Sequence, residues 1–134
     1  MKRLGVIFSI LLLGSFFVTR QVFSANNDII INEIGAYEAS GHEWIEIWNK
    51  GSEPVDLTDW KFWEGDTNHG LSVSSTDVVV GAGEYAAITQ DANQFILDYP
   101  GFYGSIFDSS WGSLNESGEE IGLKDSAGNF VENF

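Results

Sequence analysis

The chain of 134 residues contains no cysteine, and this absence excludes several kinds of chemistry. Disulfide bridges, thiol nucleophiles, cysteine-based zinc sites and cysteine-linked cofactors all require that residue. A fold without disulfides must rest on apolar packing. For this packing the sequence supplies 5 Trp, 4 Tyr and numerous Ile, Leu and Val residues.

Basic residues are also scarce. The chain has 6 Lys and Arg against 20 Asp and Glu, and three of the basic residues, Lys2, Arg3 and Arg20, precede the first acid. Residues 28–134 therefore carry 3 minus 20, or −17, formal charges. Polyanions are bound through Lys and Arg, so we expect no direct binding of nucleic acid or anionic lipid. The acidity either keeps an exported protein soluble or attracts cations, and we favour the first explanation.

Long apolar runs are confined to the start of the chain. Two basic residues follow Met1, and residues 4–18 then form an apolar run of 15 residues that small and polar residues interrupt. A membrane-spanning helix requires about 20 apolar residues, so this run predicts a secretory signal peptide. The alternative is an uncleaved signal anchor.

Small residues near the end of this segment provide the cleavage site. We favour a cut after Ser24 and hold Ala25 as the second choice. A signal peptide over residues 1–25 leaves 134 minus 25, or 109, residues, which suits a single domain over 26–134. The predicted location is secreted or at the cell surface, with no transmembrane span after cleavage.

The remaining sequence consists of short β-branched and aromatic runs that end in turn residues, a pattern typical of strands that bury one face. Strands are expected at 28–34, 43–49, 55–57, 60–63, twice within 78–89, at 120–124 and at 130–134. A loop is expected at 65–70. One short helix is expected over 91–99, capped by Asp91 and ended by Pro100. The pattern predicts an all-β sandwich with one short helix.

Several of these segments resemble the lamin-tail domain (LTD) in their order and spacing. The matching pieces are Asn32-Glu33, Glu43-x-Ile45-Glu46-Ile47-x-Asn49, Leu57-x-x-Trp60, Gly83-Glu84-Tyr85, residues 107–114, Gly118-Glu119 and residues 123–128. The resemblance is to the exported bacterial type and covers about residues 28–134. It implies an immunoglobulin-like β-sandwich that is not an enzyme, in which the motif acids and Asn49 satisfy backbone groups of loops and edges.

The end of the chain departs from this resemblance. Lamin-tail domains usually finish with a longer strand after the glycine that corresponds to Gly128, whereas this sequence stops at Phe134. We expect either a short closing edge strand or, preferably, a piece of a longer multidomain protein.

An aromatic platform is the main candidate ligand site. Trp44, Glu46 and Trp48 alternate with Ile45 and Ile47, so the two sets face opposite sides of one strand. If the isoleucines face the core, the tryptophans face outward, and the parity of Trp63 predicts that it joins them. Flat rings beside carboxylates suit a carbohydrate ligand. The alternative, which we favour, is that other elements or a partner cover these rings.

The loop at 65–70 places Asp66 and Asn68 at alternate positions, which faintly resembles a calcium loop but lacks the later bidentate Glu. A plain turn is the favoured interpretation, with His69 as a loop residue. Calcium is the only cofactor that the sequence suggests.

Catalytic motifs are not found in the sequence. His42 and His69 have no Gly-x-Ser-x-Gly elbow and no metal-ligand spacing, and Glu43 and Glu46 point to opposite faces of their strand. We therefore predict a non-catalytic module for protein interaction or surface tethering, which could act by strand addition at a sheet edge. The alternatives are a carbohydrate-binding module for cell-surface polysaccharide and calcium-dependent adhesion. The oligomeric state is not predicted.

Overall fold

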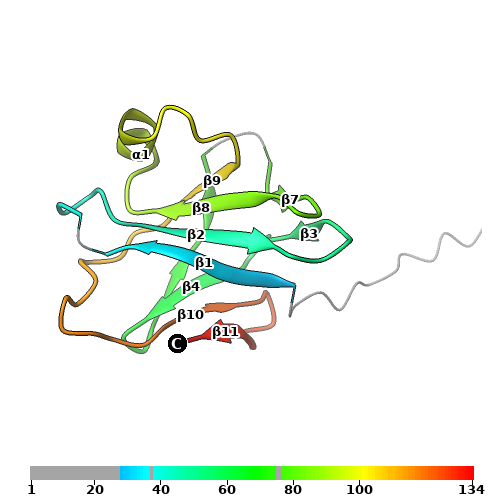
Figure 1. Cartoon of the computed structure of the whole chain (residues 1–134). Helices are drawn as coiled ribbons and strands as arrows, with labels where there is room; N and C mark the ends of the chain where they lie inside the picture. Colours follow the sequence, from blue (N-terminus) through cyan, green and yellow to red (C-terminus); the bar gives the residue numbers. More distant parts are fainter. Residues whose placement is uncertain (1–27, 37, 75–76) are drawn as a thin grey trace, which may run out of the picture.

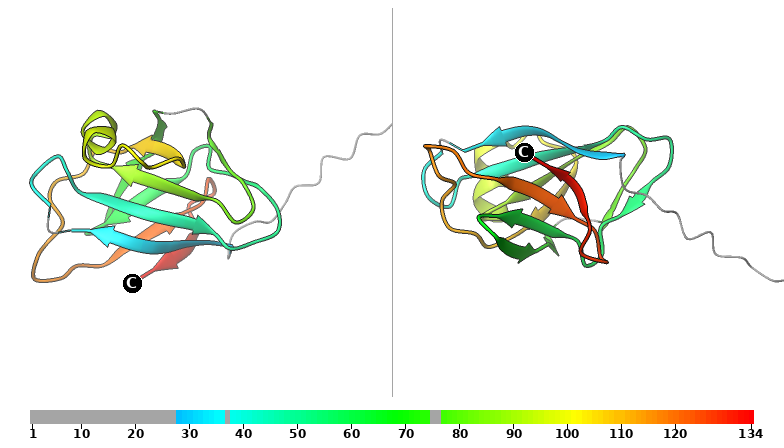
Figure 2. Two further views of the ribbon diagram at one scale, coloured as in Figure 1. Left: turned by 45° about the horizontal axis from the view of Figure 1, so that its top comes forward. Right: turned by 90° about the horizontal axis from the view of Figure 1, so that it is seen from below.

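The structure, a computed structural model, describes residues 28–36, 38–74 and 77–134. The predicted signal peptide at 1–25 lies outside these residues. Within them, alternating apolar side chains place most strands in two packed sheets, shown in Figure 1 and from two further sides in Figure 2. This arrangement confirms the predicted immunoglobulin-like β-sandwich.

The first sheet contains the longest strands. Its order is β1 (Ile29–Gly35), β2 (Trp44–Asn49), β8 (Tyr85–Thr89), β9 (Ser105–Asp108) and β6 (Ser72–Val73). Strand β2 pairs antiparallel with β1 and β8, whereas β8 and β9 are parallel. A parallel pair cannot be joined by a hairpin, so the chain crosses over between β8 and β9.

The second sheet packs against the first. Its order is β11 (Phe130–Asn133), β10 (Ile121–Lys124), β4 (Lys61–Glu64) and β5 (Thr67–Gly70). A separate pair joins β3 (Val55–Asp56) to β7 (Val79–Val80). Strands β11 and β1 are in contact at one side of the sandwich, and the Ile31 backbone N–H donates to the Glu132 carboxylate there.

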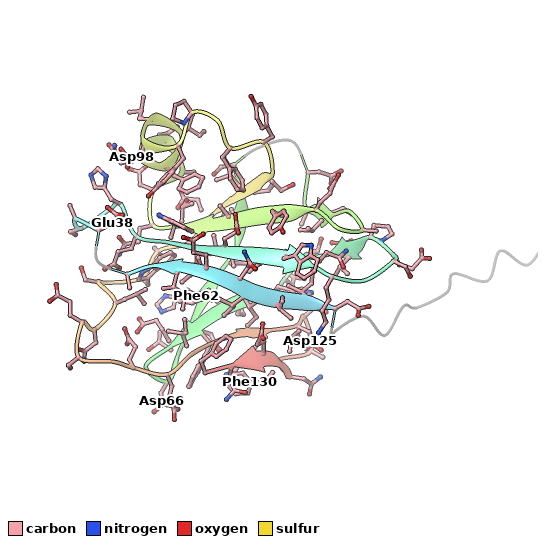
Figure 3. All side chains as sticks on the ribbon, viewed as in Figure 1. Glu38, Phe62, Asp66, Asp98, Asp125 and Phe130 are labelled. Carbon is pink, nitrogen blue, oxygen red and sulfur yellow. The ribbon has the colours of Figure 1, made fainter. Side chains whose placement is uncertain are left out.

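The core lies between the two sheets and follows the predicted parity. Ile45 and Ile47 of β2 are fully buried, and so are Phe62 of β4 and Leu123 of β10. The Phe62 side chain lies inside the sandwich in Figure 3. Trp60 is also buried, and it has the same strand parity as Phe62.

Helix α1 (Ala92–Asp98) forms the crossover between β8 and β9. The Asp91 side chain accepts hydrogen bonds from the backbone N–H groups of Asn93 and Gln94, which caps the helix as predicted. Phe95 turns toward the sheet and packs with Ala87 and Ile106. The helix therefore covers part of the outer face of the first sheet, on the side away from the core.

The prediction of a loop over residues 65–70 is wrong. Gly65 and Asp66 have φ values of 49° and 65°, so the chain reverses within these two residues, and 67–70 form β5. Consecutive residues with positive φ make the tight turn that matches the twist of a hairpin. Strands β6 and β9 were also not predicted.

Among the residues that the structure describes, no helix has the length and apolar character needed to cross a membrane.

Candidate functional site

Glu43 is a structural residue. Its side chain is 2% exposed, and its Oε2 accepts hydrogen bonds from Trp111 Nε1 at 3.1 Å and from the Leu114 backbone N–H at 2.9 Å. A buried carboxylate is stable only when hydrogen bonds replace its hydration. Glu43 therefore fastens the segment at 111–114 to the start of β2.

Asn49 has the same role at the other end of β2. Its Nδ2 donates to the carbonyl oxygens of Glu53 at 2.8 Å and Val80 at 3.0 Å, while Oδ1 accepts from the Gly51 N–H at 3.0 Å. The fully buried amide thus holds the turn after β2 against β7. The expectation that these motif residues satisfy backbone groups is confirmed for Glu43 and Asn49.

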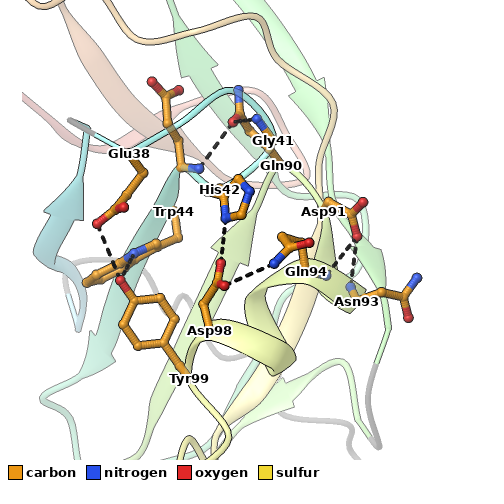
Figure 4. A network of polar contacts seen from close by, with 11 residues as sticks. Glu38, Gly41, His42, Trp44, Gln90, Asp91, Asn93, Gln94, Asp98 and Tyr99 are labelled. Carbon is orange, nitrogen blue, oxygen red and sulfur yellow. Dashed lines mark hydrogen bonds and ion pairs between the residues drawn. The ribbon is translucent and has the colours of Figure 1, made fainter.

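Trp44 is half-buried and packs against the helix and the residue that follows it instead of forming an open platform. Its indole meets the rings of Phe95 and Tyr99 edge-on, with centroids 6.1 and 5.4 Å away. Its Nε1 donates to the Tyr99 hydroxyl at 3.0 Å, as Figure 4 shows. On the other side Gly35 leaves room for the ring, because a Cβ there would lie 2.8 Å from Trp44 Cδ1.

A polar network beside Trp44 fixes the helix further (Figure 4). His42 Nδ1 lies 2.6 Å from Asp98 Oδ2, and Gln94 Nε2 donates to Asp98 Oδ1 at 2.9 Å. The pKa of Asp98 is lowered, chiefly by the hydrogen bond with His42. Burial opposes this shift, while the hydrogen bond from Gln94 and the charge of His42 add to it. These groups are engaged in holding the helix to the segment before β2.

Trp48 is half-buried like Trp44, and it pairs with the exposed ring of Tyr85. Their rings stack at an interplanar angle of 15° and a centroid distance of 6.0 Å, on neighbouring strands β2 and β8. Tyr85 is 43% exposed, and Trp48 Nε1 donates to the Gly83 carbonyl at 3.3 Å. Glu46 lies two residues before Trp48 on the same face of β2, and its Oε1 accepts a hydrogen bond from Asn32 Nδ2 at 2.7 Å.

A groove runs beside this pair on the outer face of the first sheet. We call it the outer groove; it has a volume of about 680 Å³ and is lined by Glu46, Asp77, Val79, Glu84, Tyr85 and residues 101–105. A smaller hollow of about 210 Å³ continues from it toward Trp44, since Glu46 and Phe102 line both. The loop from α1 to β9 forms one wall.

Trp63 does not join Trp44 and Trp48, which corrects the expected platform. It belongs to β4 in the second sheet and is 7% exposed. Phe130 meets its ring edge-on at 5.0 Å, and Lys124 Nζ lies 5.1 Å from the ring centroid. The outward parity was correct, but a neighbouring strand and a cation cover the ring.

The two residues considered for calcium, Asp66 and Asn68, both lie in the β4–β5 hairpin. Asp66 lies at the outer tip of the β4–β5 hairpin, as Figure 3 shows. Asn68 Oδ1 accepts a hydrogen bond from Lys124 Nζ at 3.1 Å. Among the described residues, no group of three or more His, Asp or Glu side chains is arranged to hold a metal ion.

His69 is a strand residue, not the expected loop residue. Its Nδ1 lies 2.7 Å from the Ser110 carbonyl, and its Nε2 lies 3.1 Å from Glu64 Oε1. Burial, together with the hydrogen bond and the charge of Glu119, raises the pKa of Glu64 above its ordinary value, while His69 opposes this shift. The cluster links β4, β5 and the segment before β10.

Sequence reasoning missed Tyr85, Phe102 and Tyr103 as residues of the candidate site. Tyr103 is 97% exposed and follows the helix, far along the chain from Glu46. For Phe102 and Tyr103 the available signal was the aromatic composition of the segment at 99–103, and Tyr85 was noted only as part of a family motif. The crossover between parallel strands brings this segment to the groove.

Comparisons with known proteins agree with this architecture. A search of curated proteins finds no match. The family model described as Lamin Tail Domain matches residues 23–134, which is most of the chain and includes every described strand. The chain therefore belongs to the lamin tail domain family.

Proposed function

We propose that this lamin tail domain is an exported, non-catalytic module that mediates protein interaction or tethering at the cell surface. The family consists of immunoglobulin-like domains without enzymatic activity, which supports the non-catalytic role. The basic start and apolar run at 2–18 support export. The acidic surface suits a protein that stays soluble outside the cell.

The observation that carries the proposal is the aromatic surface beside the outer groove. Tyr85 and Tyr103 are exposed, and Trp48 stacks on Tyr85 at the groove margin. Exposed tyrosine and tryptophan rings are enriched in protein interfaces, because a rigid ring buries a large area with little loss of conformational entropy. Trp63 is buried, and the half-buried Trp44 packs against Phe95 and Tyr99.

A carbohydrate-binding module for cell-surface polysaccharide is the second candidate. The stacked pair of Trp48 and Tyr85 with Glu46 nearby supports it, because ring faces and carboxylates are the groups that hold sugars. Calcium-dependent adhesion through Asp66 and Asn68 has less support, because Asn68 accepts a hydrogen bond from Lys124.

Export is tested by expressing residues 1–134 and determining, by mass spectrometry, the mass of the product recovered outside the cytoplasm. Cleavage after Ser24 or Ala25 gives a mass that identifies the new N-terminus. A product that keeps residues 1–25 and stays with the membrane would support the uncleaved anchor. A product found only inside the cell would contradict export.

Binding is tested with the protein immobilised and exposed separately to surface proteins and to purified cell-wall polysaccharide, with calcium and with a chelator. The proposal predicts retention of a defined protein that persists in the chelator. Retention of polysaccharide alone would favour the second candidate. Loss of all retention on chelation would assign a role to calcium.

A further inference from the structure

The outer groove combines negative charge with exposed aromatic rings. Its lining includes three carboxylates, from Glu46, Asp77 and Glu84, and none of the described residues that line it is basic. These acids come from β2, from the segment before β7 and from the turn before β8, so tertiary folding brings them to one surface. A cationic group that enters the groove meets negative charge from several sides.

The carboxylates keep capacity for a ligand. Glu46 uses Oε1 to accept from Asn32, and Glu84 uses Oε2 to accept from the Gly81 N–H at 2.9 Å. A carboxylate has two oxygens that each accept more than one hydrogen bond. Among the described residues, no hydrogen bond occupies Glu46 Oε2 or Glu84 Oε1.

The rings add a second reason to expect a cation. The faces of Tyr and Trp rings carry negative potential, which attracts Lys and Arg side chains. Tyr85 and Tyr103 line the groove together with Phe102, and the Trp48–Tyr85 stack extends the aromatic surface toward the strand end. Rings and carboxylates at one surface favour a cationic ligand over an anionic one.

We propose that the outer groove binds a Lys- and Arg-containing segment of a partner protein. This inference rests on the proposed interaction function and names its site and the chemistry of its partner. The charge of −17 over residues 28–134 favours approach of a basic partner at a distance, and the groove then selects the bound position. A neutral glycan carries no charge, so the negative charge of the three carboxylates would not attract it.

The first test uses nuclear magnetic resonance on the isotopically labelled protein titrated with a peptide of alternating Lys, Arg and Gly. Backbone signals of Tyr85 and of residues 101–105 are expected to shift in a saturable manner. Shifts spread over all acidic surfaces without saturation would overturn the proposal, because they would indicate unspecific charge attraction.

The second test measures affinity for the same fluorescein-labelled peptide with a matched control. The Glu46→Gln, Tyr103→Ala double variant is expected to weaken binding about tenfold or more, because it removes one charge and one exposed ring. Tyr103 is almost fully exposed, so its loss leaves the core intact. The control Glu53→Gln, Phe134→Ala removes the same charge and an exposed ring outside the groove.

Equal weakening in the double variant and its control would overturn the groove as the site. Binding of a neutral oligosaccharide at the groove, with no binding of the peptide, would overturn it in favour of the carbohydrate candidate. If the surface protein retained by the wild type is retained equally by the groove variant, the groove assignment fails while the interaction function stands. If the wild type retains no protein at all, the function itself fails.

Discussion

Glu43 and Trp111 are joined by a buried hydrogen bond of 3.1 Å from the indole Nε1 to the carboxylate. The same Oε2 accepts from the Leu114 N–H, so one side chain satisfies two buried donors that are 68 and 71 residues away along the chain. Glu43→Ala leaves both donors unpaired and is expected to cost about 3 kcal/mol of unfolding free energy.

Urea denaturation measures this loss, and hydrogen exchange at Leu114 reports the local opening. Glu43→Gln is the matched control, because the glutamine carbonyl still accepts a hydrogen bond and should lose less stability. An alanine variant as stable as the wild type would show that the carboxylate is not needed to hold the segment at 111–114.

Substitutions of Asn49 test whether its side chain acts as a hydrogen-bond donor. Its Nδ2 faces two backbone carbonyls, so Asn49→Asp places a carboxylate oxygen against acceptors and should destabilise at least as much as Asn49→Ala. We expect losses of about 2 to 4 kcal/mol for both variants. Thermal unfolding at neutral pH compares them. An Asn49→Asp variant as stable as the wild type would contradict the two hydrogen bonds that Asn49 Nδ2 donates.

Gly35 is expected to be intolerant of a side chain. A Cβ at this position would overlap the Trp44 indole, which Phe95, Tyr99 and its hydrogen bond hold in place. Gly35→Ala should therefore cost about 1 to 3 kcal/mol. Gly101→Ala is a control, because nothing lies within 4 Å of its added carbon. Unchanged unfolding of the Gly35 variant would mean that the Trp44 ring moves freely.

Glu64 makes stability depend on pH. Its pKa in the folded domain lies above the ordinary value of 4.5, through burial first and then through Glu119, so the folded state holds this proton more tightly than the unfolded chain. The stabilising contribution is therefore fully present below about pH 4.5 and is lost as pH rises through the folded-state pKa.

Replacing the acid tests this assignment. Glu64→Gln cannot ionise, so at neutral pH it should be more stable than the wild type by about 0.5 kcal/mol, with the difference vanishing below about pH 4.5. The amide can still form a hydrogen bond with His69 Nε2. Melting curves across this pH range, with Glu53→Gln as an exposed control, provide the measurement. A constant difference at every pH would contradict the raised pKa.

Much of the fold could be predicted because local physics determines it. The alternation of Ile45 and Ile47 with polar neighbours fixes which side of β2 is buried, and Asp91 and Pro100 bracket a helix that forms as expected. The hairpin at Gly65 and Asp66 was predicted as a longer loop, because the tight pairing of β4 with β5 depends on cross-strand neighbours that the turn residues alone do not reveal.

The sequence by itself determined the β-sandwich, the inward faces of its strands, the acidity and the family, since periodicity, charge and motif order are properties of the chain. Tertiary structure decided which rings stay accessible. Trp63 faces outward as its parity requires, yet Phe130 and Lys124, more than 60 residues away, cover it. The outer groove exists because parallel pairing of β8 and β9 forces a crossover that carries Phe102 and Tyr103 to Glu46. Contacts between residues so far apart depend on packing of the whole domain, and no local pattern encodes them.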